Sequence, residues 1–227
     1  MAQPNPCTRR AFVARAALVQ AVALGAPRAR GDSRSVPSRP PRPVIDITDL
    51  YHPHQDPGDN VDLVAAYGLP EVDLRAVILD VTETYRHDIP RDPGYIPVTQ
   101  LNALFGRQVP CAAAPSRPLR DLDDPAHDAP AFLQGGIELL LGTLEAAEDP
   151  VDIVSFGSAR PLAIALNREP DLLMAKVRLV HLCAGNSDPG FMEWEWGDLE
   201  WNVALDPLAF IRVMRSQLPI ALYPCAT

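Results

Sequence analysis

Short apolar runs alternate with helical patterns along the chain from residue 43 onward. The run at 74–81 is apolar almost throughout, which is typical of a parallel strand buried on both faces. The pattern predicts strands at 44–47, 74–81, 109–113, 151–156, 177–182 and 219–223, and helices at 61–69, 98–105, 131–147, 162–167 and 207–217. This alternation predicts an α/β domain with an open, mostly parallel sheet and helices on both faces.

The segment before the fourth strand contains a polar loop and the clearest helix. Residues 115–130 follow no regular period, and long loops in compact domains often act as lids or bind ligands. The helix at 131–147 is amphipathic. Its predicted apolar stripe consists of Phe132, Ile137, Leu140, Leu141 and Leu144.

The length and the charge of the chain limit the classes of function that it can have. The chain has 227 residues, of which 47% are hydrophobic, and this suits one α/β domain with a sizeable core. Residues 1–42 hold eight of the 20 basic residues and one of the 29 acidic ones, so the remainder carries 12 basic and 28 acidic residues and a net charge of −16. A segment with this negative charge does not bind nucleic acid by neutralising phosphates. It favours a metal-binding protein or one that acts on neutral small molecules.

The basic N-terminus resembles a twin-arginine export signal. It contains Thr-Arg-Arg-Ala-Phe-Val at 8–13 and then an apolar stretch at 16–26, which is shorter than the roughly 20 residues of a membrane span. The sequence predicts a signal peptide at 1–30, a Pro/Arg/Ser-rich linker at 31–42 and a folded domain at 43–227, in a protein exported to the periplasm or beyond. A disordered Arg/Ala tail is the alternative.

Carboxylates crowd the end of the first predicted strand. Asp46, Asp49, Asp56, Asp59 and Asp62 fall within seventeen residues that contain no Lys or Arg. Carboxylates packed this densely repel one another unless a cation lies between them. Hard divalent cations prefer such oxygen ligands, Ca²⁺ with six to eight and Mg²⁺ with fewer protein ligands and more water. The carboxyl end of a strand is also where open α/β sheets bind ligands. The pattern favours a metal or polar-ligand site over a solvated acidic loop.

Other polar and thiol residues leave alternatives open. Asp80, near the end of the second predicted strand, is well placed for a site but is more often structural. Cys183 and Cys225 each end a predicted strand, so an exported protein would be able to join them. Free thiols at these positions and at Cys111 are the equal alternative.

Several ordered landmarks resemble the inosine–uridine preferring nucleoside hydrolases. Pro-Val-Ile-Asp-Ile-Thr-Asp at 43–49 is similar to the family's opening strand and its Asp-Thr-Asp signature. Residues 69–77 are similar to its passage from a helix into the second strand, and residues 151–163 to its central strand, glycine and helix. Glu-Trp-Asn at 200–202 with Asp-Pro at 206–207 resembles its Glu-Phe-Asn…Asp-Pro motif. The resemblance covers residues 43–227.

The resemblance implies an open α/β fold, a tightly held Ca²⁺ and hydrolysis of the N-glycosidic bond of ribonucleosides. In such a site a calcium-bound water, deprotonated by a metal-ligating Asp, attacks the anomeric carbon. The implied partner is a nucleoside or a related glycoside, and dimers or tetramers are common in the family. Asp49 matches a metal ligand that is also the catalytic base, and Asp62 matches a second ligand. The lengthened loop between them offers Asp56 and Asp59 as further ligands.

The motif residues that follow the central strand imply substrate contacts. Glu200 and Asn202 match a pair that contacts ribose hydroxyls, and Asn186 matches a further ribose contact.

Departures from the family pattern keep other functions open. Ile47 and Val61 replace two signature aspartates, and Arg160 stands where a metal-ligating Thr is usual. The family's late metal-ligating Asp and its neighbouring His lie beyond the matched region. A non-catalytic nucleoside- or sugar-binding protein and a truncated, inactive homologue therefore remain alternatives. Arg160 either pairs with Asp49 or Asp62 in place of a metal, or caps a neighbouring carboxylate away from the site.

Overall fold

The computed structural model describes residues 40–51, 57–82, 92–186 and 199–225. Its strands form one sheet in the order β3-β2-β1-β4-β5-β6, and every neighbouring pair is parallel. The strands are β1 (Arg42–Thr48), β2 (Val72–Leu79), β3 (Cys111–Ala113), β4 (Val151–Ser155), β5 (Val177–Leu182) and β6 (Ile220–Leu222). Each predicted strand is confirmed, and the predicted parallel sheet with them.

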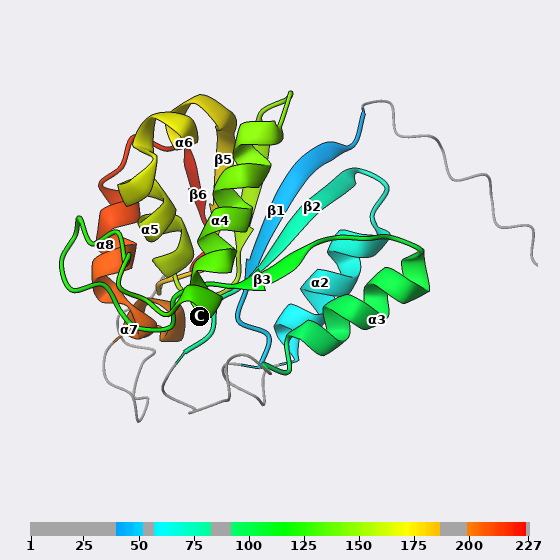
Figure 1. Cartoon of the computed structure of the whole chain (residues 1–227), viewed down its shortest axis with the longest axis horizontal. Coiled ribbons are helices and arrows are strands. Elements are labelled where there is room, and N and C mark those ends of the chain that lie inside the picture. Colours follow the sequence, from blue (N-terminus) through cyan, green and yellow to red (C-terminus); the bar gives the residue numbers. More distant parts are fainter. Residues whose placement is uncertain (1–39, 52–56, 83–91, 187–198, 226–227) are drawn as a thin grey trace, which may run out of the picture. The chain divides into compact units, whose positions relative to one another are not determined.

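The helices cover both faces of this sheet, as predicted (Figure 1). One face carries α2 (Gly58–Gly68) and α3 (Tyr95–Phe105), and α3 ends at Gly106, whose φ of 64° is left-handed. The other face carries α4 (Ala131–Ala146), α5 (Arg160–Arg168), α6 (Pro170–Lys176) and α8 (Pro207–Met214), and the short α7 (Trp201–Leu205) precedes α8. The sequence pattern did not predict α6 or α7.

Two apolar clusters fill the space between the sheet and the helices. Alternate residues of a strand point to opposite faces, so Val44 of β1 packs with Leu63 and Tyr67 of α2, whereas Ile45 packs in the cluster that contains Ile137 of α4. This alternation explains why the central strands are apolar on both sides.

The buried stripe of α4 differs from the predicted one at its first position. Phe132 is 53% exposed, and Leu133 is buried instead. At 3.6 residues per turn, Leu133 lies in line with Ile137, Leu140 and Leu144, which are all buried, whereas Phe132 lies off that line. The apolar character of Phe132 was therefore a misleading signal.

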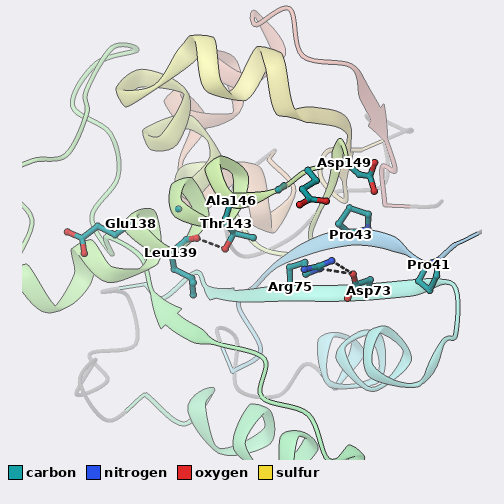
Figure 2. A pocket seen from close by; sticks show the side chains of 12 residues that line it. Pro41, Pro43, Asp73, Arg75, Glu138, Leu139, Thr143, Ala146 and Asp149 are labelled. Atoms are coloured by element: carbon teal, nitrogen blue, oxygen red, sulfur yellow. Dashed lines mark hydrogen bonds and ion pairs between the residues drawn. The ribbon is translucent and has the colours of Figure 1, made fainter.

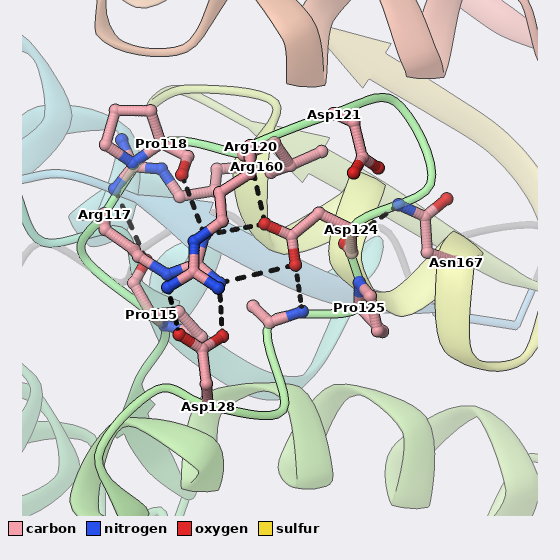
Figure 3. Close-up of polar contacts among 12 residues, drawn as sticks. Pro115, Arg117, Pro118, Arg120, Asp121, Asp124, Pro125, Asp128, Arg160 and Asn167 are labelled. Atoms are coloured by element: carbon pink, nitrogen blue, oxygen red, sulfur yellow. Dashed lines mark hydrogen bonds and ion pairs between the residues drawn. The ribbon is translucent and has the colours of Figure 1, made fainter.

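The polar loop between β3 and α4 is fastened to its surroundings by side chains (Figure 3). Arg117 donates a hydrogen bond of 2.7 Å to Asp124, and this bond holds the pKa of the Asp124 carboxyl well below its usual range. Arg168 of α5 donates at 2.7 Å to the carbonyl of Pro125, and Asn167 donates at 3.0 Å to the carbonyl of Asp124. These contacts tie the described loop to α5, so they do not support the expectation of a lid.

The chain order places the carboxyl ends of β1 and β4 at a topological switch point. From β1 the chain moves outward to β2 and β3, and then returns to β4 on the other side of β1. Ligands in open α/β sheets bind in the crevice at such a point.

None of the helices in the described part of the chain has the length and the apolar character of a membrane span.

Candidate functional site

Three residues that follow adjacent strands meet at the switch point. Asp49 follows β1, Asp80 follows β2 and Gly157 follows β4, and the Asp80 amide donates to the carbonyl of Thr48 at 2.9 Å. A Cβ placed on Gly157 would lie 3.2 Å from the Cβ of Asp49 and 2.8 Å from Oδ2 of Asp80. Both carboxylates are buried. The structure thus places Asp49 at the predicted edge, and it places Asp80 beside it.

The first turn of α2 brings two more of the predicted carboxylates to this region. Asp59 is buried and accepts hydrogen bonds from the Leu50 amide at 3.2 Å and the Thr48 hydroxyl at 3.4 Å, so it is turned back onto the end of β1. Asp62 lies about one turn further along the helix and is half-buried. Asp56 lies outside the described residues.

Asp46 is a carboxylate whose setting the sequence did not reveal. It lies within β1, paired with Val77 of β2 and Val154 of β4, and only 1% of its surface is exposed. Neither of its carboxyl oxygens has a hydrogen-bond partner. Burial, and then the charges of Asp59 and Asp62, raise the pKa of Asp46 to about 8. A carboxyl group with this pKa is largely neutral at pH 7. Its place two residues after Val44, on the same face of β1, is the sequence feature that puts it on the side covered by α2.

The described residues do not assemble a metal shell. Across the part of the chain that the structure describes, no three His, Cys, Asp or Glu side chains lie close enough to hold one ion. The donors are of the type that calcium prefers, but Asp59 is bonded to the backbone and to a hydroxyl at the end of β1. As placed, these residues do not fit the calcium site that the family resemblance implies.

Arg160 resolves one of the alternatives left open by the sequence. Its side chain is completely buried, with Nε at 3.3 Å from Asp206 and Nη1 at 3.7 Å from Asp80. The guanidinium therefore lies beside Asp206 and Asp80 rather than Asp49 or Asp62. Because Asp80 lies next to Asp49, the alternative of a carboxylate away from the site holds only for Asp206. Asp206 was noted in the sequence only as part of a motif.

Two of the three residues expected to contact ribose, Glu200 and Asn202, tie α7 to the sheet. Glu200 is the N-cap of α7 and accepts hydrogen bonds from the amides of Asn202 at 3.0 Å and Gly185 at 2.8 Å. The Asn202 side-chain amide donates at 2.9 Å to the carbonyls of Phe156 and Cys183, which follow β4 and β5. Both residues lie at the predicted edge of the sheet. Their contact with a sugar stays a prediction.

Asn186, Cys183 and Cys225 follow the ends of β5 and β6. Asn186 bridges to Cys225, whose amide donates at 2.8 Å to the Gly185 carbonyl, and the side-chain oxygen of Asn186 is buried without a partner. Cys111, Cys183 and Cys225 are free thiols, so the structure contains no bond between the latter two.

A cavity of about 690 Å³ lies away from these residues, between α4 and the first half of β2 (Figure 2). Its walls include Pro43, Leu139 and Asp149, together with an ion pair of 2.6 Å between Arg75 and Asp73. The cavity lies toward the amino ends of the strands, whereas ligands in this architecture bind at the carboxyl ends. It is therefore not the candidate site.

Comparisons with known proteins find relatives in sequence and in fold. No family model matches the chain. The pyrimidine-specific ribonucleoside hydrolase RihA of Escherichia coli O127:H6 is 29% identical over 185 residues, which cover 74% of this chain and 57% of RihA. The chain thus spans little more than half the length of the curated relatives that it matches.

Solved structures show the same fold. The inosine–uridine preferring nucleoside hydrolase from Bacillus anthracis matches with a TM-score of 0.61 and 19% identity, over 81% of this chain and 64% of that protein. The plant nucleoside hydrolase PpNRh1 matches with a TM-score of 0.55 and 21% identity, over 82% and 60%. The chain is therefore an α/β protein with the nucleoside hydrolase fold. Its sequence and its fold are both similar to those of nucleoside hydrolases, in agreement with the resemblance found in the sequence.

Proposed function

We propose that the protein hydrolyses the N-glycosidic bond of ribonucleosides at the carboxyl edge of its sheet. The observation that carries this proposal is the meeting of Asp49, Asp80 and Gly157 at the switch point between β1 and β4. Support also comes from RihA, a relative whose name is that of a pyrimidine-specific ribonucleoside hydrolase. The matched region covers 57% of RihA, so ribonucleoside hydrolysis by this chain is a proposal.

Asp49 is the base in this proposal. Its carboxylate accepts a proton from a water molecule whose oxygen bonds to the anomeric carbon, and the electrons of the N-glycosidic bond leave with the nucleobase, which takes a proton from solvent. Only 6% of Asp49 is exposed, so little bulk water competes for it. The unpartnered side-chain oxygen of Asn186 is an acceptor for a sugar hydroxyl, and Glu200 and Asn202 lie at the same edge.

The binding of a calcium ion is a separate part of the proposal. Asp49, Asp59 and Asp62 supply the negative charge that attracts a divalent cation. The described side chains do not form a shell around one point, so we assign no catalytic step to the ion. Metal analysis of the purified protein, with and without chelator, tests it directly. Close to one equivalent of calcium per chain supports this part, and a metal-free protein with full activity contradicts it.

Ribose release from a panel of nucleosides tests the activity. We expect the unmodified chain to release ribose from at least one of them, and Asp49→Asn to reduce the rate by about 100-fold or more, because a general base typically contributes 10²–10⁴-fold. Asp73→Asn, at the amino end of β2, is the matched control and should keep the full rate. The proposal fails if the unmodified chain releases no ribose, or if Asp49→Asn is as active as the control.

A nucleoside- or sugar-binding protein without catalysis is the second candidate. The observation in its favour is that no three candidate ligands converge on one point among the described residues. Calorimetric binding of a nucleoside that the protein leaves intact would support this candidate over the hydrolase.

We also propose that residues 1–30 direct export through the twin-arginine route. The paired arginines at 9 and 10 and the apolar stretch that follows support it. Replacing both arginines by lysine should retain a tagged chain inside the cell. Equal export of the two forms would contradict the proposal.

A further inference from the structure

We propose that Arg160 is the positioning residue of this site. Its buried guanidinium holds together the segments that form the carboxyl edge. It thereby fixes Asp49 in the position from which this carboxylate acts as the base. The test by enzyme activity rests on the proposed function. The test by amide hydrogen exchange does not depend on activity.

Arg160 bonds to three segments that are distant in sequence. Its Nη1 donates to the carbonyl of Ser116 at 2.6 Å, of Val81 at 3.0 Å and of Pro115 at 3.3 Å, and its Nε donates to Asp206 at 3.3 Å. Arg160 itself begins α5, immediately after β4. One side chain therefore joins the ends of β2, β3 and β4 to the start of α8.

The carboxylate partners of Arg160 extend this network. Asp206 caps α8 by accepting the Ala209 amide at 3.0 Å, and it accepts the Leu119 amide at 2.9 Å from the loop after β3. Asp206 is 0% exposed, so these bonds do not compete with water. Loss of the guanidinium would leave this buried carboxylate without its cation.

Asp80 connects Arg160 to the site. Oδ1 of Asp80 lies 3.7 Å from Nη1 of Arg160, and Oδ2 accepts the Ser158 amide at 2.7 Å. Asp80 also contacts Gly157, which in turn lies against Asp49. A shift of the guanidinium is thus passed to Asp49 through Asp80 and Gly157, which lie between them.

The guanidinium cannot be replaced by another cation without loss of this arrangement. An ammonium group carries the same charge but lacks the planar fork that donates to carbonyls and a carboxylate in different directions.

Arg160→Met and Arg160→Lys test the proposal against Arg168→Met. Arg168 lies on the same helix and also bonds to a loop, donating to the Pro125 carbonyl at 2.7 Å and to Gln134 at 2.6 Å, but away from the carboxyl edge. Well below the melting temperature, we expect kcat for ribose release to fall by about 100-fold in both Arg160 variants, because misplacement by about 1 Å is enough for such a loss. Arg168→Met should lower the melting temperature and keep kcat.

Amide hydrogen exchange supplies the measurement that does not depend on activity. The amides of Ser158 and Leu119 are bonded to Asp80 and Asp206, so Arg160→Met should accelerate their exchange and Arg168→Met should not. If the unmodified chain releases no ribose, the proposed function fails, and exchange alone decides the positioning role. Unchanged exchange at both amides overturns the inference. An Arg160→Met variant whose kcat matches that of Arg168→Met also overturns it.

Discussion

Gly157 contacts Asp80 so closely that a Cβ at position 157 would lie 2.8 Å from Oδ2 of Asp80. This oxygen also accepts the Ser158 amide at 2.7 Å, so the carboxylate cannot turn away without losing that bond. The contact explains why the end of β4 requires a glycine.

Gly157→Ala should therefore weaken both the fold and the site. We expect a loss of about 1–3 kcal/mol in the free energy of unfolding, as is typical of overpacking, and a lower rate of ribose release. Urea denaturation and the ribose assay measure the two effects. An alanine variant as stable and as active as the unmodified chain would show that Asp80 relaxes freely.

Two glycines of α4 should respond in opposite directions to the same substitution. A Cβ on Gly136 would lie 2.6 Å from the carbonyl carbon and oxygen of Ala113, which are backbone atoms of β3, whereas a Cβ on Gly142 meets nothing within 4 Å. Gly136→Ala should destabilise the protein by about 2–3 kcal/mol. Gly142→Ala should stabilise it by about 0.5–1 kcal/mol through better helix propensity. Urea midpoints that move in the same direction would contradict the close packing of α4 on β3.

Asp46 should make stability depend on pH. Its pKa is about 8 in the folded protein, against an ordinary value of 3.8, so between these values the folded state binds a proton that the unfolded state releases. Stability is then full below about pH 4, falls as the pH rises, and levels off above about pH 8.

Asp46→Asn removes this titration. Melting temperatures measured between about pH 5 and pH 9 should decline more steeply for the unmodified chain than for the variant. Asp73→Asn, a half-exposed carboxylate in β2, is the control and should keep the steep decline. Parallel curves for the unmodified chain and Asp46→Asn would mean that Asp46 does not retain its proton in the folded state.

Glu200 should matter for stability even without a ligand. Because it caps α7 and also accepts the Gly185 amide, Glu200→Ala should cost about 1–2 kcal/mol in the absence of nucleoside. Thermal unfolding of the ligand-free protein measures this loss. An unchanged melting temperature combined with weaker nucleoside binding would instead assign Glu200 to the sugar alone.

Local sequence patterns predicted most of the fold because the period of apolar residues reports directly which faces are buried. The predicted strand at 177–182 coincides with β5, and the predicted helices at 98–105 and 131–147 correspond to α3 and α4. The helices α6 and α7 were missed because each has seven residues or fewer, too few for a clear period. Helices this short depend on caps and packing rather than on intrinsic propensity.

The sequence by itself determined the α/β alternation, the resemblance to nucleoside hydrolases and the presence of acidic residues at the end of β1, since these depend on residue type and order. Only the tertiary structure decided which groups meet. It paired Arg160 with Asp206, 46 positions away, and it buried Asp46 without a partner. Such outcomes depend on which strands become neighbours and how far water is excluded, because the energy of a charge depends on its distance to other charges and on the surrounding dielectric.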